Sequence, residues 1–485
     1  MTGLLTFLDL ALATASIYFV HQLYSQSHKN AAPLPPGPRQ LPIIGNLLDM
    51  PSEKEWRKFA EWGEMWDMLE KKGSIYSERP MLQMGGELVG WKNTLVLLPY
   101  GDRFKSYRRN FHRSIGSHTS MSRFYPVEES ETHKFLKRLL STPDDLIKHI
   151  RQTAGAIILH ISHGYEVEVT GDPFVELADI ALEQFSLSTA PGNFIVNLVP
   201  SLSFLPDWFP GAGFKKTARE WAQTLDEMIE KPHKYVKEQI AKGIAKPSFT
   251  ADLLGNSDVD AGQEFDIKWS AGSLYGGGAD TSRLFYAFFK AMVLFPDVAM
   301  NAQAEIDSVI GQDRLPSLAD KTNLPYVTAL ALEVLRWHPV VPTGFAHVVK
   351  EDDIHNGYLI PRGTLIIPNI WKILHDPKTY ASPMSFDPTR FLGPNPEPDP
   401  RQVCFGFGRR ICPGRVLADA SIFISCAMTL AVFDISKHVD VSGQVVEPIV
   451  DQTTGIISHP TPFRCSIKPR SEKALALINA EIERS

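Results

Sequence analysis

The sequence predicts one large, mainly helical domain with a small β region, preceded by an N-terminal transmembrane helix. Three observations support this fold class. Apolar residues recur at helical spacing over most of the chain, strand-like runs cluster between residues 358 and 367, and a nearly continuous apolar run opens the sequence. Because no second linker interrupts residues 41–485, we expect them to form a single domain.

The composition is that of a globular protein without a disulfide framework. Of the 485 residues, 44% are hydrophobic and 21% are charged, which suffices for a buried core and excludes disorder as the main state. The 49 basic and 55 acidic residues give a net charge of −6, which argues against a nucleic-acid partner. The four cysteines form no CxxC pair, so any functional cysteine acts singly.

Residues 3–20 (GLLTFLDLALATASIYFV) form the predicted membrane anchor. At a rise of about 1.5 Å per residue, a helix of this length nearly crosses a hydrocarbon core of about 30 Å. Asp9 is its one charge, and no small-residue cleavage site follows cleanly. Lys29 and Arg39 follow the run while no basic residue precedes it, so the positive-inside rule predicts a single-pass protein with a cytosolic remainder. A buried helix or a cleaved signal peptide is the alternative.

The chain thus divides into three predicted segments. Residues 1–24 form the anchor, residues 25–40 a Pro/Gly-rich hinge, and residues 41–485 the large globular domain. The hinge holds Pro33, Pro35, Pro36, Gly37 and Pro38, and such a run favours extended, semi-rigid backbone.

Several elements of the large domain are clear from their apolar spacing. One helix has a face formed by Phe214, Ala218, Trp221, Leu225 and Met228. Pro232 is expected to bend or break that helix. The further predicted helices are Asp266–Phe295, Asn301–Ile310, Leu324–Trp337 and Val416–Phe433. The predicted strands, Tyr358–Ile360 and Thr364–Ile367, flank a turn at Pro361–Gly363.

The strongest functional signal is the segment Phe405–Gly414 (FGFGRRICPG), which ends just before a predicted helix. A cysteine at a helix N-terminus is expected to have a lowered pKa, because unpaired N–H groups favour the thiolate. Arg409 and Arg410 add positive charge beside Cys412. A thiolate held in this way is a nucleophile or a metal ligand. Cys426 and Cys465 fit buried structural cysteines instead.

Phe405, Gly408, Arg410, Cys412 and Gly414 match the FxxGxRxCxG loop of the cytochrome P-450 superfamily, which the chain resembles along nearly its whole length. The resemblance implies the cytochrome P-450 fold and a haem b (iron protoporphyrin IX) cofactor. Cys412 would then be the axial ligand of the haem iron, and the other four residues would shape the cofactor-binding loop. Cys404 lies outside the motif.

The glycine-rich segment Gly276–Ser282 resembles the oxygen-binding segment of the same family. Three glycines within a helix cost roughly 1 kcal/mol each relative to alanine, so close approach of a ligand has to offset them. Asp280 and Thr281 match the acid–hydroxyl pair that relays protons in the family and are the predicted catalytic residues. Ser282 stands where many members have a second threonine.

Glu333 and Arg336 match the ExxR pair of the family, and Arg390 lies in a segment resembling the one that supplies a second arginine. These three residues are expected to form a buried structural network. The resemblance also implies that Arg410, Arg108 and His347 bind the haem propionates. Phe104 replaces the tryptophan that usually precedes Arg108 by four positions, which removes an indole N–H but keeps aromatic packing.

The resemblance breaks down after the predicted first helix, Trp56–Glu64. Family members continue with two strands before a helix resembling Trp66–Gly73, whereas Met65 and Trp66 are adjacent here. On the order of two to three dozen residues are missing, enough for two strands. In the family those strands pair with Gly344–Val349 and Thr364–Pro368, so we expect an unpaired sheet edge and a first helix without its tether.

The details resemble fungal microsomal members acting in secondary metabolism, including the O-methylsterigmatocystin oxidoreductase group. The resemblance implies an endoplasmic-reticulum enzyme that inserts one oxygen atom from O2 into a hydrophobic small molecule. Electrons from NADPH would arrive through NADPH–cytochrome P-450 reductase, because the chain has no flavin or nicotinamide motif. The implied substrate-lining segments are Gly86–Leu98, Leu274–Gly278, Pro342–Phe345 and Thr454–Ile457. The apolar stretch Phe194–Phe214 is expected to roof the site and touch the membrane, or to be ordinary core.

Two other functions remain open at this level. One is a haem-thiolate isomerase or dehydratase, against which Asp280 and Thr281 argue, since such enzymes can dispense with the proton relay. The other is a truncated or splice-variant member that binds haem poorly and lacks activity, which the missing strands favour.

Overall fold

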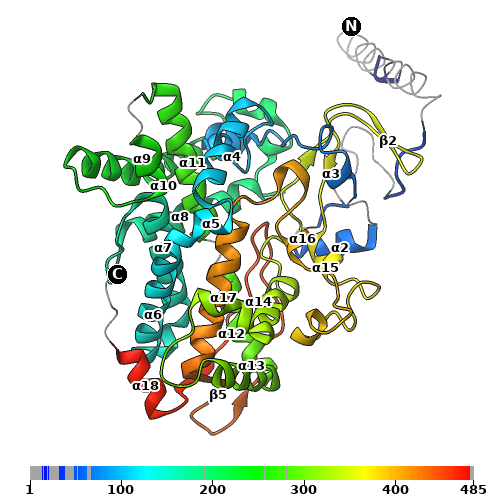
Figure 1. The fold of residues 1–485 in the computed structure, drawn as a ribbon. Helices are drawn as coiled ribbons and strands as arrows, with labels where there is room; N and C mark the ends of the chain where they lie inside the picture. The colour runs from blue at the N-terminus through cyan, green and yellow to red at the C-terminus, as the bar shows by residue number, and fades with distance from the viewer. Residues whose placement is uncertain are drawn as a thin grey trace.

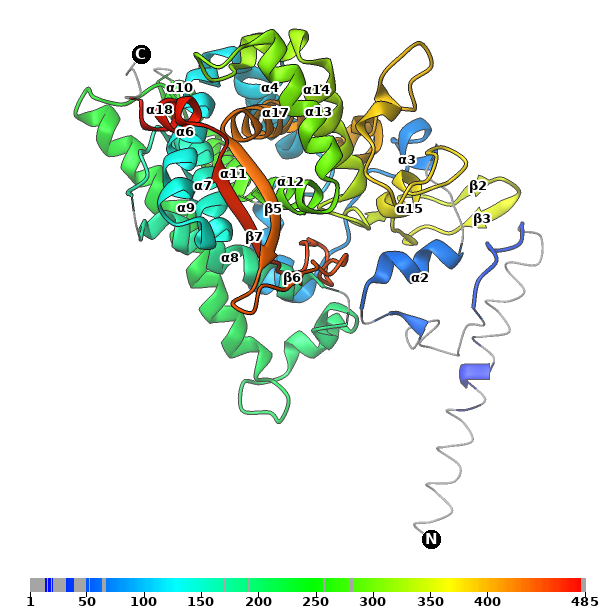
Figure 2. The ribbon, with the colours of Figure 1, turned by 90° about the horizontal axis from the view of Figure 1, so that it is seen from below.

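The computed structural model describes residues 14, 16–18, 20, 32–38, 49–51, 53–62, 67–169, 171–190, 192–255, 258–279 and 282–480. A large helical body occupies one side of the molecule (Figure 1). The short strands β2 and β3 lie at the opposite side with helices α2, α3 and α15, and a second view shows the same separation (Figure 2).

The helices follow one another through most of the described chain. The first part contains α2 (Glu55–Trp62), α3 (Asp67–Lys71), α4 (Asp102–Ile115), α5 (His118–Met121), α6 (Tyr125–Ser141), α7 (Leu146–His163), α8 (Pro173–Thr189), α9 (Phe214–Ala241) and α10 (Phe249–Leu254). The second part contains α11 (Ala261–Ala279), α12 (Ser282–Leu294), α13 (Pro296–Val309), α14 (Pro325–Trp337), α15 (Ile370–Leu374), α16 (Arg401–Cys404), α17 (Arg415–Val432) and α18 (Glu472–Asn479). The predicted mainly helical fold class is therefore confirmed.

Helix α17 is the central element of the core. It is apolar on nearly all sides and packs against α6, α13 and α14. Taken singly, it is the one helix within the described ranges that is long and apolar enough to span a membrane, but 78% of it is buried inside the protein. Its hydrophobicity therefore reflects core packing.

The strands within the described residues form three small antiparallel sheets. Their pairs are β1 (His347–Val348) with β4 (Leu365–Ile366), β2 (Asp353–His355) with β3 (Tyr358–Ile360), and β5 (Phe433–Val439) with both β6 (Val445–Val446) and β7 (Cys465–Pro469). The predicted turn forms, with Gly363 at φ +85°. However, the strands on its two sides pair with different partners, because β4 returns to β1.

Most predicted helices are present, with two differences. Helix α9 runs from Phe214 to Ala241 with Pro232 inside it, so the expected break does not occur, and the expected bend stays a prediction. The stretch predicted as Asp266–Phe295 appears as α11 and α12, and residues 280 and 281 between them lie outside the described residues. Cys426 is fully buried in α17, as expected for a structural cysteine.

The region of the missing strands agrees in part with the sequence analysis. Helix α2 ends at Trp62 and α3 begins at Asp67, so only residues 63–66 separate them, too few for two strands. No described strand pairs with the outer edge of β4, where Leu365 is 53% exposed. The outer edge of β1 is covered by Glu78, whose carbonyl accepts the N–H of Val348 at 2.9 Å.

Helix α2 keeps a tether despite the missing strands, so that expectation was wrong. Trp56 is fully buried, and its carbonyl accepts a hydrogen bond from Asn369 Nδ2 at 2.6 Å. The Lys372 ammonium donates to the Ala60 carbonyl at 3.1 Å. These contacts hold α2 against α15.

The predicted anchor, residues 1–24, lies almost wholly outside the described residues. Positions 14, 16–18 and 20 are helical, and Ile17, Tyr18 and Val20 are exposed. Part of the predicted hinge is described, and the carbonyl of Pro33 accepts the N–H of Leu359 at 2.8 Å. The division into anchor, hinge and catalytic domain stays a prediction.

Candidate active site

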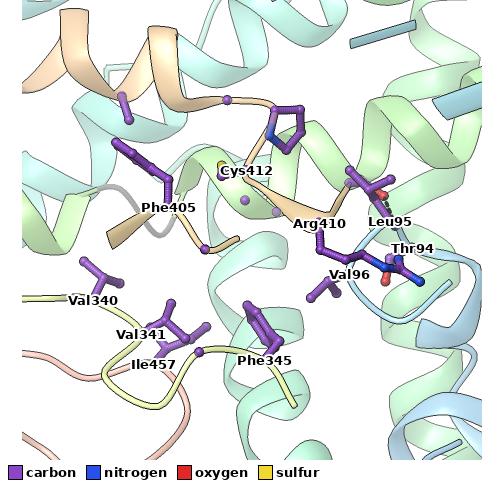
Figure 3. Close-up of a pocket in the computed structure, with 18 of the residues that line it drawn as sticks. Thr94, Leu95, Val96, Val340, Val341, Phe345, Phe405, Arg410, Cys412 and Ile457 are labelled. Atoms are coloured by element: carbon purple, nitrogen blue, oxygen red, sulfur yellow. Dashed lines mark hydrogen bonds between the residues drawn. The ribbon is translucent and has the colours of Figure 1, made fainter. Parts of the chain in front are cut away.

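A largely apolar cavity of about 350 Å³ lies beside the cysteine loop. Its walls come from the loop before α17, from α11, from the segment around residues 91–96, from α8, and from the connection between α14 and β1. Figure 3 shows Cys412 and Arg410 on one side of the cavity and Val340, Val341, Phe345 and Ile457 on the other. The predicted motif residues and the apolar lining therefore face the same space.

The cysteine loop is a tight turn before α17. Gly406 and Gly408 have φ angles of +77° and +51°, in a region that disfavours side chains. A Cβ atom on Gly408 would lie 2.5 Å from the Leu69 carbonyl oxygen, so α3 packs directly on the loop. The N–H of Cys412 donates to the Phe405 carbonyl at 2.8 Å, which fixes the turn with the thiol lining the cavity.

The pKa of Cys412 is raised, contrary to the sequence prediction. Burial disfavours the thiolate more than the backbone donor at Gly414 and the charge of Arg108 favour it. A thiol in this environment ionises when it coordinates a cation, and a haem iron is such a cation. The loop therefore suits a metal ligand better than a free nucleophile.

Arg410 provides the clearest sign of an anionic partner. Its Nε donates to the Ser77 carbonyl at 2.7 Å, while both terminal nitrogens are buried without a hydrogen-bond acceptor among the described residues. Burial lowers its pKa to about 10, so it remains charged at neutral pH. The guanidinium carbon lies 4.0 Å from the ring centroid of Phe104, the residue that replaces the family tryptophan. Buried charged donors require acceptors, and the carboxylates of a haem fit this need.

Arg108 and His347 also line the cavity. Arg108 donates to the Ile411 carbonyl in the cysteine loop, and burial lowers its pKa. His347 Nδ1 lies 2.6 Å from the Tyr76 carbonyl oxygen. Burial, aided by the charge of Arg79, lowers the pKa of His347 to about 3, so the ring is neutral. A neutral imidazole has one N–H group, and here Nδ1 carries it and donates to the Tyr76 carbonyl. Nε2 is then a hydrogen-bond acceptor, so it can donate to a carboxylate only after it gains a proton.

Arg79 is a cavity residue that the sequence analysis missed. Its Nε donates to the Val96 carbonyl at 2.9 Å, and Nη1 donates to the carbonyls of Phe345 and Ala346 at 2.7 and 2.9 Å. Burial, followed by repulsion from Arg410, lowers its pKa to about 9. Arg79 thus joins the segment around residue 96 to the connection before β1 and adds a third cation to this wall.

Glu333, Arg336 and Arg390 come together in the structure. Arg336 binds both carboxylate oxygens of Glu333 at 2.7 Å, and Arg390 Nε reaches Glu333 Oε1 at 3.1 Å. The side chains of Glu333 and Arg336 are 0% exposed and that of Arg390 is 3% exposed. None of the three lines the cavity, which is the arrangement of a structural network.

The glycine-rich part of α11 borders the cavity. A Cβ atom on Gly278 would lie 2.4 Å from the side chain of Ile158 in α7, whereas one on Gly277 would meet nothing within 4 Å. Packing against α7 thus accounts for Gly278, and Gly277 keeps space open beside the cavity. Asp280 and Thr281 lie outside the described residues, so the proton relay stays a prediction.

The predicted lining segments are partly represented. Residues 94–96, Leu274, residues 276–278, residues 344–345 and Ile457 line the cavity, whereas Pro342 and Thr454 do not. The cavity also includes Leu182 and Phe185 of α8, and Cys404, which carry no motif in the sequence. No residue of Phe194–Phe214 lines the cavity, so the expected roof does not form; instead Phe204 and Trp208 are exposed.

Comparisons with known proteins agree with this geometry. A sequence model of the cytochrome P450 family matches residues 65–467. Cytochrome P450 monooxygenase 208 of Postia placenta is 50% identical over 99% of both chains, and cytochrome P450 monooxygenase claR of Ampulloclitocybe clavipes is 42% identical over 98% of this chain and 93% of its own. A zebra fish cytochrome P450 solved with abiraterone has the same fold, with a TM-score of 0.65 at 22% identity over 84% of this chain and 91% of that one.

The comparisons also bear on the missing stretch. The alignment with the Postia protein spans 507 positions, 22 more than the 485 residues of this chain, so at least that many positions are absent here. The family match begins at Met65, where the sequence analysis locates the missing residues.

With half of its residues identical to those of a fungal monooxygenase along nearly its whole length, the chain belongs to the cytochrome P450 family of haem-dependent monooxygenases.

Proposed function

We propose that this chain inserts one oxygen atom from O2 into a hydrophobic small molecule, with electrons from NADPH delivered by a separate NADPH–cytochrome P450 reductase. The observation that carries the proposal is the apolar cavity that Cys412 and the unpaired guanidinium of Arg410 share. When bound there, the haem supplies the oxygen chemistry. The protein supplies its thiolate ligand, cations for its carboxylates, and a water-poor space for the substrate.

Each site residue has a proposed task in this scheme. Cys412 ligates the iron, within the loop formed by Phe405, Gly408 and Gly414. Arg410 and Arg108 neutralise the carboxylates of the cofactor, and His347 provides a third contact once its Nε2 carries a proton. Asp280 and Thr281 deliver protons, as the resemblance implies. The network of Glu333, Arg336 and Arg390 holds the core in place behind the cysteine loop.

The cavity lining favours an apolar substrate. Phe185 and Leu182 of α8, Val96, Phe345 and Ile457 present hydrocarbon surface, which binds by burial of apolar area. The hydroxyl of Ser273, one of the polar groups in the lining, already interacts with the N–H of Leu95 at 3.0 Å. The fungal origin of the relatives supports a substrate from secondary metabolism, as in the O-methylsterigmatocystin oxidoreductase group.

We further propose that the protein is a single-pass protein of the endoplasmic-reticulum membrane with a cytosolic catalytic domain. The predicted anchor in residues 1–24 supports this location. A second support is the exposed apolar surface of the segment before α9, where Ile195, Phe204 and Trp208 are 66%, 88% and 80% exposed. Such a surface is suited to contact with a lipid interface.

The test uses the haem-loaded full chain with reductase in phosphatidylcholine vesicles. Naphthalene and anthracene serve as apolar probes under labelled dioxygen. We expect NADPH-dependent products that carry one labelled oxygen atom, and none from Cys412→Ser. Conversion without NADPH and without label would instead establish an isomerase or dehydratase.

A second candidate function rests on the missing residues. The gap of at least 22 positions and the unpaired edge of β4 favour a shortened variant with impaired haem binding. Equal haem retention by this chain and by a version restored to the length of the Postia relative would exclude that candidate.

A further inference from the structure

The interface between α6 and α17 contains polar side chains in the middle of the core. Glu128 and Thr132 lie four residues apart on α6, and Ser421 and Ser425 lie four residues apart on α17. Residues at this spacing share one face of a helix. The two helices pack together (Figure 1), and Ser421 lies near Glu128. These polar side chains therefore lie where two helices of the core meet.

Glu128 is the member of this group whose burial is least compensated by hydrogen bonds. Its residue is 0% exposed, and neither carboxylate oxygen has a hydrogen-bond partner at normal geometry among the described residues. Burial raises its pKa well above the ordinary value, although the nearby Ser421 hydroxyl and the Lys321 charge act in the opposite direction. Burial therefore favours the protonated form of this carboxyl group. A buried acid without protein partners normally binds ordered water.

A second cavity, of about 50 Å³, lies next to this group. It is lined by Thr153 and Ile158 of α7, Gly278 of α11, and Leu417, Ser421 and Ser425 of α17. A water molecule requires about 10–15 Å³ and two to four polar partners. Most of the lining is apolar, and the Thr153 hydroxyl already donates to the His149 carbonyl and accepts from Arg138. The hydroxyls of Ser421 and Ser425 supply two partners, the smallest number that a buried water requires.

The second cavity and Glu128 lie between the active site and the surface. Gly278 and Leu417 line both this cavity and the active-site cavity. On the other side, Glu128 is within electrostatic range of Asp419 and Lys321, which form an ion pair. The Lys321 side chain is 22% exposed, and Asp419 also binds Arg401 at 3.0 Å. One end of the polar group therefore reaches solvent and the other reaches the wall of the active site.

We propose that Glu128, Ser421, Ser425 and the second cavity hold a chain of buried water that carries protons from the surface near Asp419 to the active site at Gly278. The inference rests on the proposed function, since monooxygenation consumes protons in the active-site cavity. Glu128 donates its proton toward Ser421 and the cavity water, and regains one from water on the Asp419 side. No electron moves, and the charge of each group is restored after each transfer.

The charged groups around Glu128 set its pKa and therefore the pH range over which it can exchange a proton. Lys321 from the segment Leu318–Asn323 and Asp419 from α17 face it, and Glu129 is its neighbour on α6. Lys321 lowers the pKa of Glu128, whereas Glu129 and Asp419 raise it. Glu128 is a positioning residue by this account, because it reaches the reacting groups only through water.

The test compares Glu128→Gln with a matched substitution, Glu129→Gln, in the full haem-loaded chain. Glutamine keeps the size and burial of residue 128 but cannot release a proton. Glu129 is a suitable control because its carboxylate accepts the N–H of Leu318 at 2.7 Å, which the glutamine oxygen can replace. Ser421→Ala is a second variant, which removes a cavity hydroxyl and leaves Glu128 in place.

Two readouts separate a proton path from a merely structural role. Infrared spectroscopy of the resting protein should show the carbonyl stretch of a protonated acid, sensitive to D2O, that disappears in Glu128→Gln and persists in Glu129→Gln. With reductase, NADPH oxidation by Glu128→Gln and Ser421→Ala should be slower by up to about tenfold, below the 10²–10⁴-fold range for removal of a sole proton-transfer group. Both variants should show a larger solvent isotope effect with KM unchanged.

The proposal is overturned if no such infrared band exists, or if both variants oxidise NADPH with the wild-type rate and isotope effect. Should Glu128→Gln fail to fold, Ser421→Ala decides the kinetic question alone. A wild-type chain without thiolate-ligated haem would refute the proposed function instead. That failure is distinguishable, because the infrared band is measured without turnover.

Discussion

Replacing Glu333 with glutamine tests whether the buried ion network stabilises the fold as a unit. Glu333 accepts two bonds from Arg336 at 2.7 Å, one from Arg390 at 3.1 Å and one from the N–H of Asp387 at 2.9 Å. Glutamine keeps the shape but removes the charge. Arg390 retains Glu397 at 2.6 Å, whereas Arg336 has no other carboxylate in the described part of the chain.

The expected loss of unfolding free energy depends on how Arg336 is paired after the substitution. Removing one partner of a buried ion pair typically costs about 3–5 kcal/mol, because a buried charge stays uncompensated. Arg336 still donates to the carbonyls of Leu374, Pro383 and Ser385 at 3.0, 2.8 and 3.0 Å, so we expect the lower end, about 3 kcal/mol.

The assay is urea unfolding of the haem-loaded chain, followed by circular dichroism and by haem absorbance. Glu61→Gln is the matched control, because the Lys58–Glu61 pair has the same 2.7 Å contact with both side chains about half exposed or more. Exposed pairs contribute about 0–1 kcal/mol. A loss for Glu333→Gln no larger than that of the control would refute the reasoning.

Three further predictions concern the cofactor, pH and the sheet edge. Arg410→Leu should weaken haem binding about 10- to 100-fold in a haem titration, since one charged hydrogen bond contributes about 1.5–3 kcal/mol, whereas Arg409→Leu should not. Burial lowers the pKa of His163 from 6.5 to about 3, so the native state favours the neutral ring. The stability that the neutral ring contributes to the native state is therefore lost as pH falls from 6.5 toward 3. His163→Gln should therefore flatten the fall in unfolding free energy over that range by about 1.4 kcal/mol per pH unit, and an unchanged slope would contradict this. Leu365→Lys, at the free edge of β4, should slow aggregation in light scattering without moving the unfolding midpoint.

The parts of the site that the sequence predicts well depend on short spacings. The Cys412 loop and the Glu333–Arg336 pair each bring their residues together within one turn or one helix, so residue order alone implies proximity. Arg390 is more distant, and only the family resemblance places it beside Glu333. The structure shows the contact at 3.1 Å.

The parts that the sequence could not supply depend on distant contacts. Arg79 binds the carbonyls of Val96, Phe345 and Ala346, and these partners have no sequence relation to it. The raised pKa of Cys412 has the same origin, because packing from distant elements outweighs the local effect of the helix terminus. Likewise, the strands around Gly363 take partners that the turn itself does not specify.

The most direct test of the central claim is the carbon-monoxide difference spectrum of the reduced, full-length chain. We predict the red-shifted Soret band of thiolate-ligated ferrous haem, and its loss in Cys412→Ser. A band at shorter wavelength would mean that haem is bound without the Cys412 thiolate. The absence of any haem signal would mean that this shortened chain does not assemble the site, and either result would contradict the account.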